Sequence, residues 1–169
     1  MPSPLIEKKP YPSVENICPD ARSLRIISPA YATAAGELNA IMLYTYHSLM
    51  FGAEGKEEAA ELIESIAVAE MMHLRLLGQV IIALGAAPVF TANPPCMFNF
   101  YSAKYVTYSR TLRCMAEDGV RAERQAIRGY ERMGRLLGDT RVRDITERIC
   151  EDERLHLKAY EDILSSFKS

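Results

Sequence analysis

The sequence lacks the cysteine spacing of a disulfide framework or of a sulfur-ligated metal site. Its four cysteines, at positions 18, 96, 114 and 150, are scattered and include no C-x-x-C pair. Widely spaced free cysteines are typical of proteins kept in a reducing compartment. We therefore predict that Cys18, Cys96, Cys114 and Cys150 are reduced packing residues of a cytoplasmic protein, without a metal-binding role.

The sequence also lacks a strong net charge and a membrane-directing segment. Its 20 basic and 22 acidic residues give a net charge of −2, which indicates no highly charged partner. The opening residues, MPSPLIEKKPYPS, have no apolar core of a signal peptide. No uninterrupted apolar run approaches the roughly 20 residues that cross a bilayer. We expect a cytoplasmic protein that binds neither membranes nor nucleic acid.

Strand signals are almost absent, and helical periodicity dominates from about residue 30 onward. Residues 1–29 hold six of the nine prolines and show no periodicity, which predicts an irregular arm that docks on a partner subunit. The proline-rich and aromatic segment 88–104 is long enough to cross a helical bundle from end to end, at about 3.3 Å per extended residue. Helices are predicted over residues 29–51, 56–84, 102–137 and 140–167.

Short, long and short connections between these helices predict an all-α fold, a ferritin-like four-helix bundle with one long crossover between helices 2 and 3. The chain would then consist of a proline-rich arm, residues 1–29, and a bundle, residues 30–169. Its length suits one domain with a substantial core that needs no disulfide bonds.

Two ionisable residues interrupt the most apolar helix, IAVAEMMHLRLLGQVIIALG. At about 100° per residue, Glu70 lies on the face that carries the apolar residues, and His73 lies close beside it. The fourth predicted helix repeats the pattern in ICEDERLHLKAYEDIL, where Glu153 and His156 face inward. The sequence therefore holds two inward-facing E-x-x-H pairs.

Each of the other two helices offers one inward acid. Glu37 is the only acid of AGELNAIMLYTYHSLMF, and it lies beside apolar residues. In the third helix, Glu117 falls on an arginine stripe that we expect to be a solvated face, whereas Glu123 falls on the opposite, apolar face. Periodicity therefore selects Glu123. The stripe consists of Arg121, Arg124, Arg128, Arg132 and Arg135.

The spacing of the acids about the two short turns gives an independent test. Residues equidistant from the turn of an antiparallel helix pair lie at the same height. The midpoint of Glu37 and Glu70 falls within the turn GAEG, and the midpoint of Glu123 and Glu153 is Gly138, in the second turn. Both hairpins are thus expected to bring their inward acids level with each other.

Four carboxylates buried together are unfavourable unless they are protonated or bound by cations. Two divalent cations would balance their charge, and carboxylate with imidazole ligands suits iron or manganese. One Glu from each of two helices and Glu-x-x-His from each of the other two is a known di-metal arrangement of four-helix bundles. The alternative is a metal-free bundle with a buried Glu/His hydrogen-bond network.

Further residues on these helices have open roles. Tyr44 and Tyr130 face inward, where they could hydrogen-bond to ligands or transfer electrons, with Tyr44 the candidate catalytic residue; both could equally be core aromatics. His47 is expected to support the site or to pack, not to bind metal. Met71 lies off the ligand face and is expected to pack against another helix or subunit.

At these residues the sequence resembles a known group of proteins. ELNAIMLYTYH, residues 37–47, closely resembles the first-helix motif of bacterioferritin. ERQAIRGYERM and GDTRVRDITERICEDERLH resemble the third and fourth helices of the bacterioferritin, rubrerythrin and manganese-catalase-like group. Met71 stands where bacterioferritin has its haem-ligating Met, although we do not expect haem. Val120 stands where the rubrerythrin third helix has the first Glu of an E-x-x-E motif.

The resemblance implies a site with two iron ions per chain, or with manganese in their place. The implied metal ligands are Glu37, Glu70, His73, Glu123, Glu153 and His156, with Glu70 and Glu153 bridging. It further implies a homodimer or larger homo-oligomer that reacts with O₂ or H₂O₂ as a ferroxidase or peroxidase, using an electron donor that the sequence does not reveal. The alternatives are a dimanganese catalase-like enzyme and a non-enzymatic iron-binding or storage protein.

Overall fold

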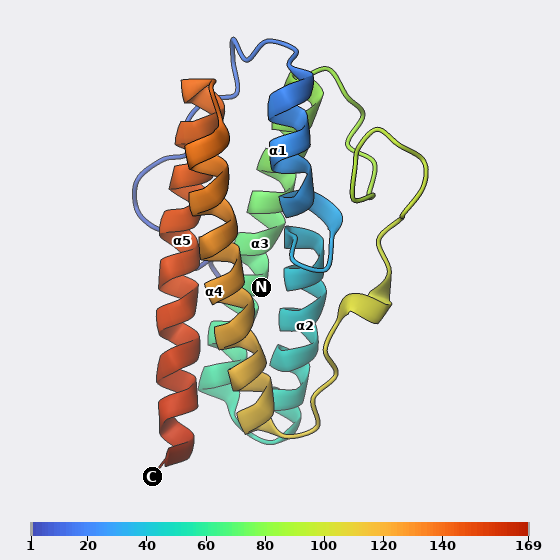
Figure 1. Ribbon diagram of the computed structural model, residues 1–169. Coiled ribbons are helices and arrows are strands. Elements are labelled where there is room, and N and C mark those ends of the chain that lie inside the picture. Colours follow the sequence, from blue (N-terminus) through green and yellow to red (C-terminus); the bar gives the residue numbers. More distant parts are fainter. Residues whose placement is uncertain (1, 169) are drawn as a thin grey trace.

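Five α-helices make up most of the computed structural model, which describes residues 2–168 (Figure 1). Four of them, α2 to α5, form an antiparallel bundle, and the short helix α1 continues the column of α2 at one end. The described residues contain no strand, only an isolated bridge between Thr91 and Phe100. The helices are α1 (Ala21–Ala32), α2 (Glu37–Ala53), α3 (Glu57–Ala83), α4 (Leu112–Leu136) and α5 (Thr140–Ser165), with single 3-10 turns η1 (Ala103–Tyr105) and η2 (Ser166–Lys168).

The bundle consists of two helical hairpins joined by one long connection. A tight turn with Gly55 at φ +69° joins α2 to α3, and Asp139 caps the start of α5 by accepting hydrogen bonds from the backbone N–H groups of Arg141 and Val142. Residues 84–111 run along the outside of the bundle to its other end (Figure 1). The predicted all-α bundle with one long crossover between its second and third helices is confirmed.

The predicted helix over residues 29–51 is wrong, because it breaks at residues 33–36. A Cβ atom on Gly36 would lie 2.8 Å from the carbonyl oxygen of Ala30, so only glycine allows the chain to fold back this closely. The side chain of Thr33 bonds to the carbonyl of Pro29 (2.7 Å) and to the N–H of Ala35 (3.2 Å), which fixes the break.

Helix α1 begins inside the segment that the sequence predicts to be irregular. Asp20 caps it by accepting from the N–H groups of Arg22 and Ser23, and Ile27 and Tyr31 are buried one turn apart. Pro29 lies inside this helix, although the sequence predicts that the first helix begins there. The division of the chain into an arm of residues 1–29 and a bundle of residues 30–169 stays a prediction.

Helix α4 starts ten residues later than the predicted residue 102. The side chain of Thr111 accepts a hydrogen bond from the N–H of Cys114 and caps the helix, while Ser102 caps only the 3-10 turn η1. Within α4, Gly119 allows a close approach to α5, because a Cβ atom there would lie 2.3 Å from ring carbons of Tyr160.

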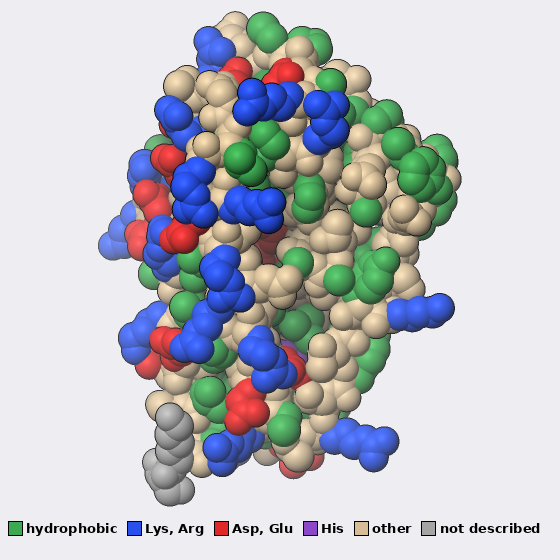
Figure 2. All heavy atoms as spheres, viewed as in Figure 1, with side chains coloured by type: hydrophobic (Ala, Val, Ile, Leu, Met, Phe, Trp, Pro, Cys, Tyr) green, Lys and Arg blue, Asp and Glu red, His purple; other side chains and the backbone are tan. Residues whose placement is uncertain are grey.

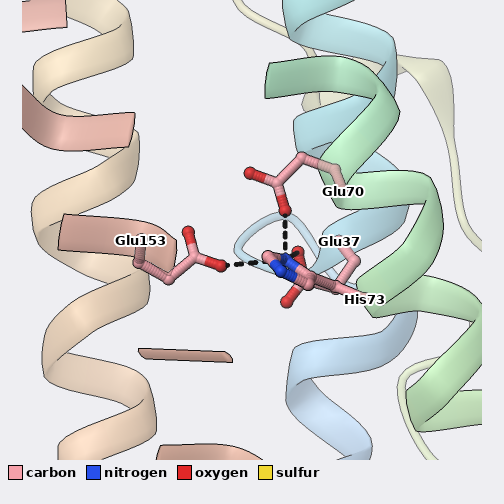
Figure 3. A group of neighbouring side chains, drawn as sticks. All are labelled: Glu37, Glu70, His73 and Glu153. Atoms are coloured by element: carbon pink, nitrogen blue, oxygen red, sulfur yellow. Dashed lines mark hydrogen bonds and ion pairs between the residues drawn. The ribbon is translucent and has the colours of Figure 1, made fainter. Parts of the chain in front are cut away.

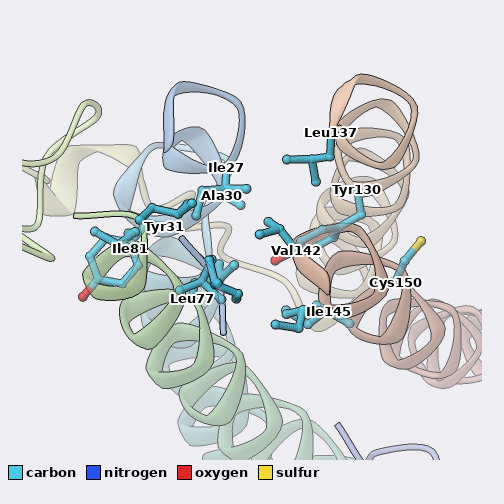
Figure 4. Packing of buried hydrophobic residues seen from close by; sticks show 14 of the residues in the cluster. Ile27, Ala30, Tyr31, Leu77, Ile81, Tyr130, Leu137, Val142, Ile145 and Cys150 are labelled. Atoms are coloured by element: carbon cyan, nitrogen blue, oxygen red, sulfur yellow. The ribbon is translucent and has the colours of Figure 1, made fainter. Parts of the chain in front are cut away.

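The buried apolar side chains form two clusters, one toward each end of the bundle. One cluster contains Ile27, Leu77, Ile81 and Ile145 (Figure 4), and the other lies around Ile63, Ile66 and Tyr160. The layer between the two clusters is where the sequence places its ionisable residues. These clusters hold the helices at fixed spacing on both sides of that layer.

By length and composition alone, helix α3 is long and apolar enough to cross a membrane. The sequence analysis did not recognise this, because it sought an uninterrupted apolar run. In this fold it is a core helix, since 56% of its most apolar window is buried inside the molecule.

The cysteines are all free, but only Cys150 is buried, so the prediction that all four are packing residues is wrong for the exposed Cys18 and Cys114.

Candidate metal centre

Six ionisable side chains from four helices meet in the layer between the two apolar clusters. None of the six is more than 4% exposed, so their charges are removed from bulk water. All six are residues that the sequence analysis selected, and the structure brings every one of them together. They are Glu37 from α2, Glu70 and His73 from α3, Glu123 from α4, and Glu153 and His156 from α5.

These side chains form two groups, in each of which four ligand atoms lie within 4.8 Å of one another. Glu70 and Glu153 belong to both groups. The first group adds Glu37 and His73, and the second adds Glu123 and His156.

In the first group, the carboxylates surround one ring nitrogen (Figure 3). Nδ1 of His73 lies 2.9 Å from Oε2 of Glu70, 3.1 Å from Oε1 of Glu153 and 3.9 Å from Oε2 of Glu37. Three acids from three helices thus converge on the same atom of the imidazole.

The second group repeats this geometry with the other oxygens of the shared acids. Nδ1 of His156 lies 3.1 Å from Oε1 of Glu70, 3.7 Å from Oε2 of Glu153 and 3.9 Å from Oε1 of Glu123. Each shared carboxylate therefore turns one oxygen toward each histidine. This is the orientation that a carboxylate bridging two cations requires.

Unpartnered atoms show that the protein alone does not satisfy this cluster. Buried polar atoms nearly always have a hydrogen-bond partner. Here Oε1 of Glu70, both carboxylate oxygens of Glu123, Oε1 of Glu153 and Nδ1 of His156 have none. The 3.1 Å pair between His156 and Glu70 is an ion-pair contact without hydrogen-bond alignment. Lone pairs that converge without donors fit a pair of divalent cations.

Helix α4 presents the acid that periodicity selects. Glu123 is fully buried, whereas Glu117 lies at the surface and pairs with Arg113 at 3.2 Å.

The far nitrogen of each histidine has a partner that the sequence analysis missed. Nε2 of His73 lies 3.1 Å from Oδ2 of Asp152, and Nε2 of His156 lies 2.8 Å from the backbone carbonyl of Leu5. In the neutral tautomer that binds metal, with the proton on Nε2, each ring would donate to this oxygen and turn the lone pair of Nδ1 toward the carboxylates. Such partners fix the tautomer and orientation of metal-binding histidines. Asp152 precedes Glu153 directly, but nothing in its periodicity marked it; Leu5 acts through its backbone and leaves no sequence signal.

Burial and mutual repulsion shift the pKa values of the outer acids upward. Burial, followed by the charges of Glu70 and Glu153, raises the pKa of Glu37 well above its usual value. Burial and the charge of Glu153 do the same for the pKa of Glu123. Both shifts favour the protonated form of these carboxyl groups.

The pKa values of the inner acids and of the histidines shift in the direction opposite to the effect of burial. Burial alone would raise the pKa values of Glu70 and Glu153, but neighbouring imidazolium groups lower both. Burial alone would lower the pKa values of His73 and His156, but the surrounding carboxylates raise both well above the usual value. The same contacts thus favour protonated imidazoles beside ionised inner acids.

Tyrosines and a third histidine border the site without joining either group. The hydroxyl of Tyr130 donates to Oε1 of Glu37. Burial and the charge of Glu123 raise the pKa of Tyr44, whose ring centroid lies 5.1 Å from that of Tyr160. Burial lowers the pKa of His47 to about 3, and its Nδ1 lies 3.1 Å from the hydroxyl of Tyr160. His47 is thus neutral and outside both groups of ligand atoms.

A cavity of about 180 Å³ connects the site with the break between α1 and α2. Ala34 and Gly36 line it together with Glu37, Glu70 and Glu123. Most of its wall is apolar. Figure 2 views the molecule from the side of α4, where arginine side chains of the predicted solvated stripe are exposed.

Comparisons with known proteins identify the family and the fold of this chain. The family model described as Rubrerythrin matches residues 31–164, which is more than half of the chain. A search among curated proteins finds no match.

Several solved structures have the same fold. A manganese catalase from Anabaena PCC7120 is 21% identical, with a TM-score of 0.79 over 96% of this chain and 80% of that one. A bacterioferritin from Desulfovibrio desulfuricans, whose diiron site was studied in different catalytic states, is 26% identical, with a TM-score of 0.75 over 88% of this chain and 81% of that one. A dodecameric thioferritin from Bacteroides fragilis is 19% identical, with a TM-score of 0.72 over 92% and 91%. The fold is therefore ferritin-like.

Proposed function

We propose that this chain, which belongs to the rubrerythrin family, holds two iron ions in its six-residue site and reacts with O₂ or H₂O₂ there. One observation carries the proposal: Glu70 and Glu153 each turn one oxygen toward His73 and the other toward His156. This arrangement supports two cation positions that would share these two acids. Glu37 and Glu123 would then be terminal ligands, one for each position.

Two redox-active ions held by these residues would supply the electrons that reduce the oxidant. The chain's own residues position and protect them. The Tyr130 hydroxyl holds one oxygen of Glu37, and Asp152 and the Leu5 carbonyl orient the two histidines. The apolar clusters on both sides exclude bulk water from the layer of carboxylates.

The dimensions of the cavity support a small oxidant as the substrate. A water molecule takes about 30 Å³ in the liquid, and drug-sized ligands need pockets of about 300–1,000 Å³. The 180 Å³ cavity accepts O₂ or H₂O₂ but no large organic molecule. Its apolar wall favours a neutral guest over free ions.

The oxygen-rich donor set suits manganese as well as iron, which makes a dimanganese catalase-like activity the second candidate. The two candidates differ in what they consume. The di-iron protein would use O₂ or H₂O₂ together with an external electron donor, whereas a catalase disproportionates H₂O₂ without one. Metal analysis of protein purified without added metal, followed by H₂O₂ assays with and without a donor, distinguishes them.

The decisive experiment counts metal per chain. Anaerobic loading with Fe²⁺ should give two ions per chain in the wild type and background levels in Glu70→Ala. Glu117→Ala is the matched control, because Glu117 lies outside the site and pairs only with Arg113. Metal-free wild-type protein under these conditions would refute the proposal and favour the buried hydrogen-bond network.

We further propose that the chain forms a homo-oligomer, as its thioferritin relative does. Large apolar side chains on α2 and α3 are exposed in the single chain, with Leu49 68%, Ile82 59% and Met71 42% accessible. Sizing by light scattering tests this. A dimer could not enclose an iron mineral and would exclude the storage alternative, whereas a closed shell would support it.

A further inference from the structure

The N-terminal segment of residues 5–11, which we call the strap, lies against the bundle beside the metal centre. The N–H of Leu5 donates to the carbonyl of Ser65 on α3 (3.1 Å), and its carbonyl accepts from Nε2 of His156 on α5 (2.8 Å). Leu5 therefore connects the two helices that carry the E-x-x-H pairs.

The strap also supports the second histidine, through Asp152. The N–H of Glu7 donates to Oδ1 of Asp152 (2.7 Å), and the hydroxyl of Tyr11 donates to Oδ2 (2.6 Å). The same Oδ2 atom lies 3.1 Å from Nε2 of His73. Both donors orient Asp152, and Asp152 in turn orients the imidazole.

A buried arginine joins the strap to α5. Arg148 is 1% exposed and forms an ion pair with Asp152 at 2.7 Å. It donates to the carbonyl of Lys9 (2.7 Å) and to that of Glu7 (2.8 Å), and its guanidinium lies 4.5 Å from the ring centroid of Tyr11. Removing the strap would leave this buried cation without three of its contacts.

We propose that the strap is a positioning element of the metal centre, and that strap docking and metal binding stabilise each other. The inference rests on the proposed di-metal function. Each histidine depends on the strap, one through the Leu5 carbonyl and the other through Asp152. Bound metal would hold the same imidazoles, so it would favour the ring orientations that the docked strap needs. Such coupling is reciprocal: metal holds the strap by the same factor by which the strap holds metal.

Limited proteolysis measures one side of this coupling. Lys8 is exposed within the strap, and the backbone carbonyls of its two neighbours accept hydrogen bonds from Arg148, so cleavage after Lys8 requires the strap to open. We expect trypsin to cleave there at least roughly 10-fold more slowly in protein loaded with two Mn²⁺ per chain than in metal-free protein. Equal cleavage rates in the two forms would overturn the inference.

Metal release measures the other side. Tyr11→Phe removes one donor to Asp152, and we expect Mn²⁺ to transfer to excess EDTA roughly 10-fold faster than from wild type. Deletion of residues 2–11 should accelerate release roughly 100-fold, since it affects both histidines. Tyr108→Phe is the matched control, because its hydroxyl contacts only the Ala103 carbonyl at 3.5 Å in the crossover. It should release metal at the wild-type rate.

Two precautions distinguish a loss of metal positioning from a general loss of structure. Release is measured far below the unfolding temperature, on variants whose circular dichroism matches wild type, so a loss of fold does not imitate faster release. If the deletion variant does not fold, metal release from Tyr11→Phe and proteolysis of the wild type still test the inference. If Tyr11→Phe releases Mn²⁺ at the wild-type rate, the inference is refuted. The proposed function would still stand in that case, provided that the protein binds two Mn²⁺ per chain. A wild type that binds no metal would refute both.

Discussion

Metal loading should release about four protons per chain near neutral pH. The expected number follows from the directions of four pKa shifts: the pKa values of Glu37 and Glu123 are raised, and so are those of His73 and His156, which favours one bound proton on each. Two divalent cations bring the same charge as those four protons, and each ligand must lose its proton to bind. The buried site then stays close to neutral in both states.

The assay is an anaerobic Mn²⁺ titration in weakly buffered solution with a pH indicator, repeated by calorimetry in two buffers of different ionisation enthalpy. The apparent affinity should rise steeply with pH, because protons and metal compete for the same atoms. Release of one proton or none per two ions would refute the charge balance, even if the metal count were correct. Glu117→Gln should release the same number of protons as wild type.

The same shifts give the metal-free protein an unusual stability profile. His73 and His156 have folded-state pKa values above the usual 6.5, and Glu37 and Glu123 lie above the usual 4.5, so folding takes up protons at all four. Stability from a raised pKa is fully present below the unfolded value and is lost as the pH rises through the folded one. The thermal unfolding temperature of metal-free protein should therefore fall between pH 6 and 9, and a rise would contradict these protonation states.

Two further changes test the site and the packing around it. Glu123→Ala leaves the other group of four ligands complete, so anaerobic Fe²⁺ loading should fall from two ions per chain to about one; loss of both ions would show that the two positions fill only together. Gly119→Ala places a methyl group into the ring of Tyr160 and should destabilise the protein by about 3 kcal/mol in urea unfolding. The control Gly134→Ala has only ordinary contacts and should stabilise α4 by about 1 kcal/mol.

The sequence was sufficient to identify the six candidate ligands, because residues on one face of a helix recur at a regular spacing along the sequence. Glu70 and His73 share a face by their spacing, and their level with Glu37 follows from the position of a short turn. The choice of Glu123 over Glu117 needed only the side of the helix on which each falls. These are local relations, and a regular helix preserves them whatever packs against it.

The partners that orient the site depend on contacts between distant parts of the chain. Asp152 and the backbone of Leu5 lie beside the histidines only because residues 5–11 pack between α3 and α5, more than 140 residues from one of their partners. A backbone carbonyl has no residue type, so no sequence pattern could mark it.

Helix breaks are likewise decided in three dimensions. The stretch 29–51 is apolar and continuous in sequence, yet the close approach of Gly36 to Ala30 divides it into α1 and α2. That break lines the same cavity as the carboxylates. The sequence by itself therefore determined which side chains form the candidate metal centre, since helical periodicity is local. Only the tertiary structure decided how the histidines are held and which segments line the cavity beside them, since both depend on which distant segments meet.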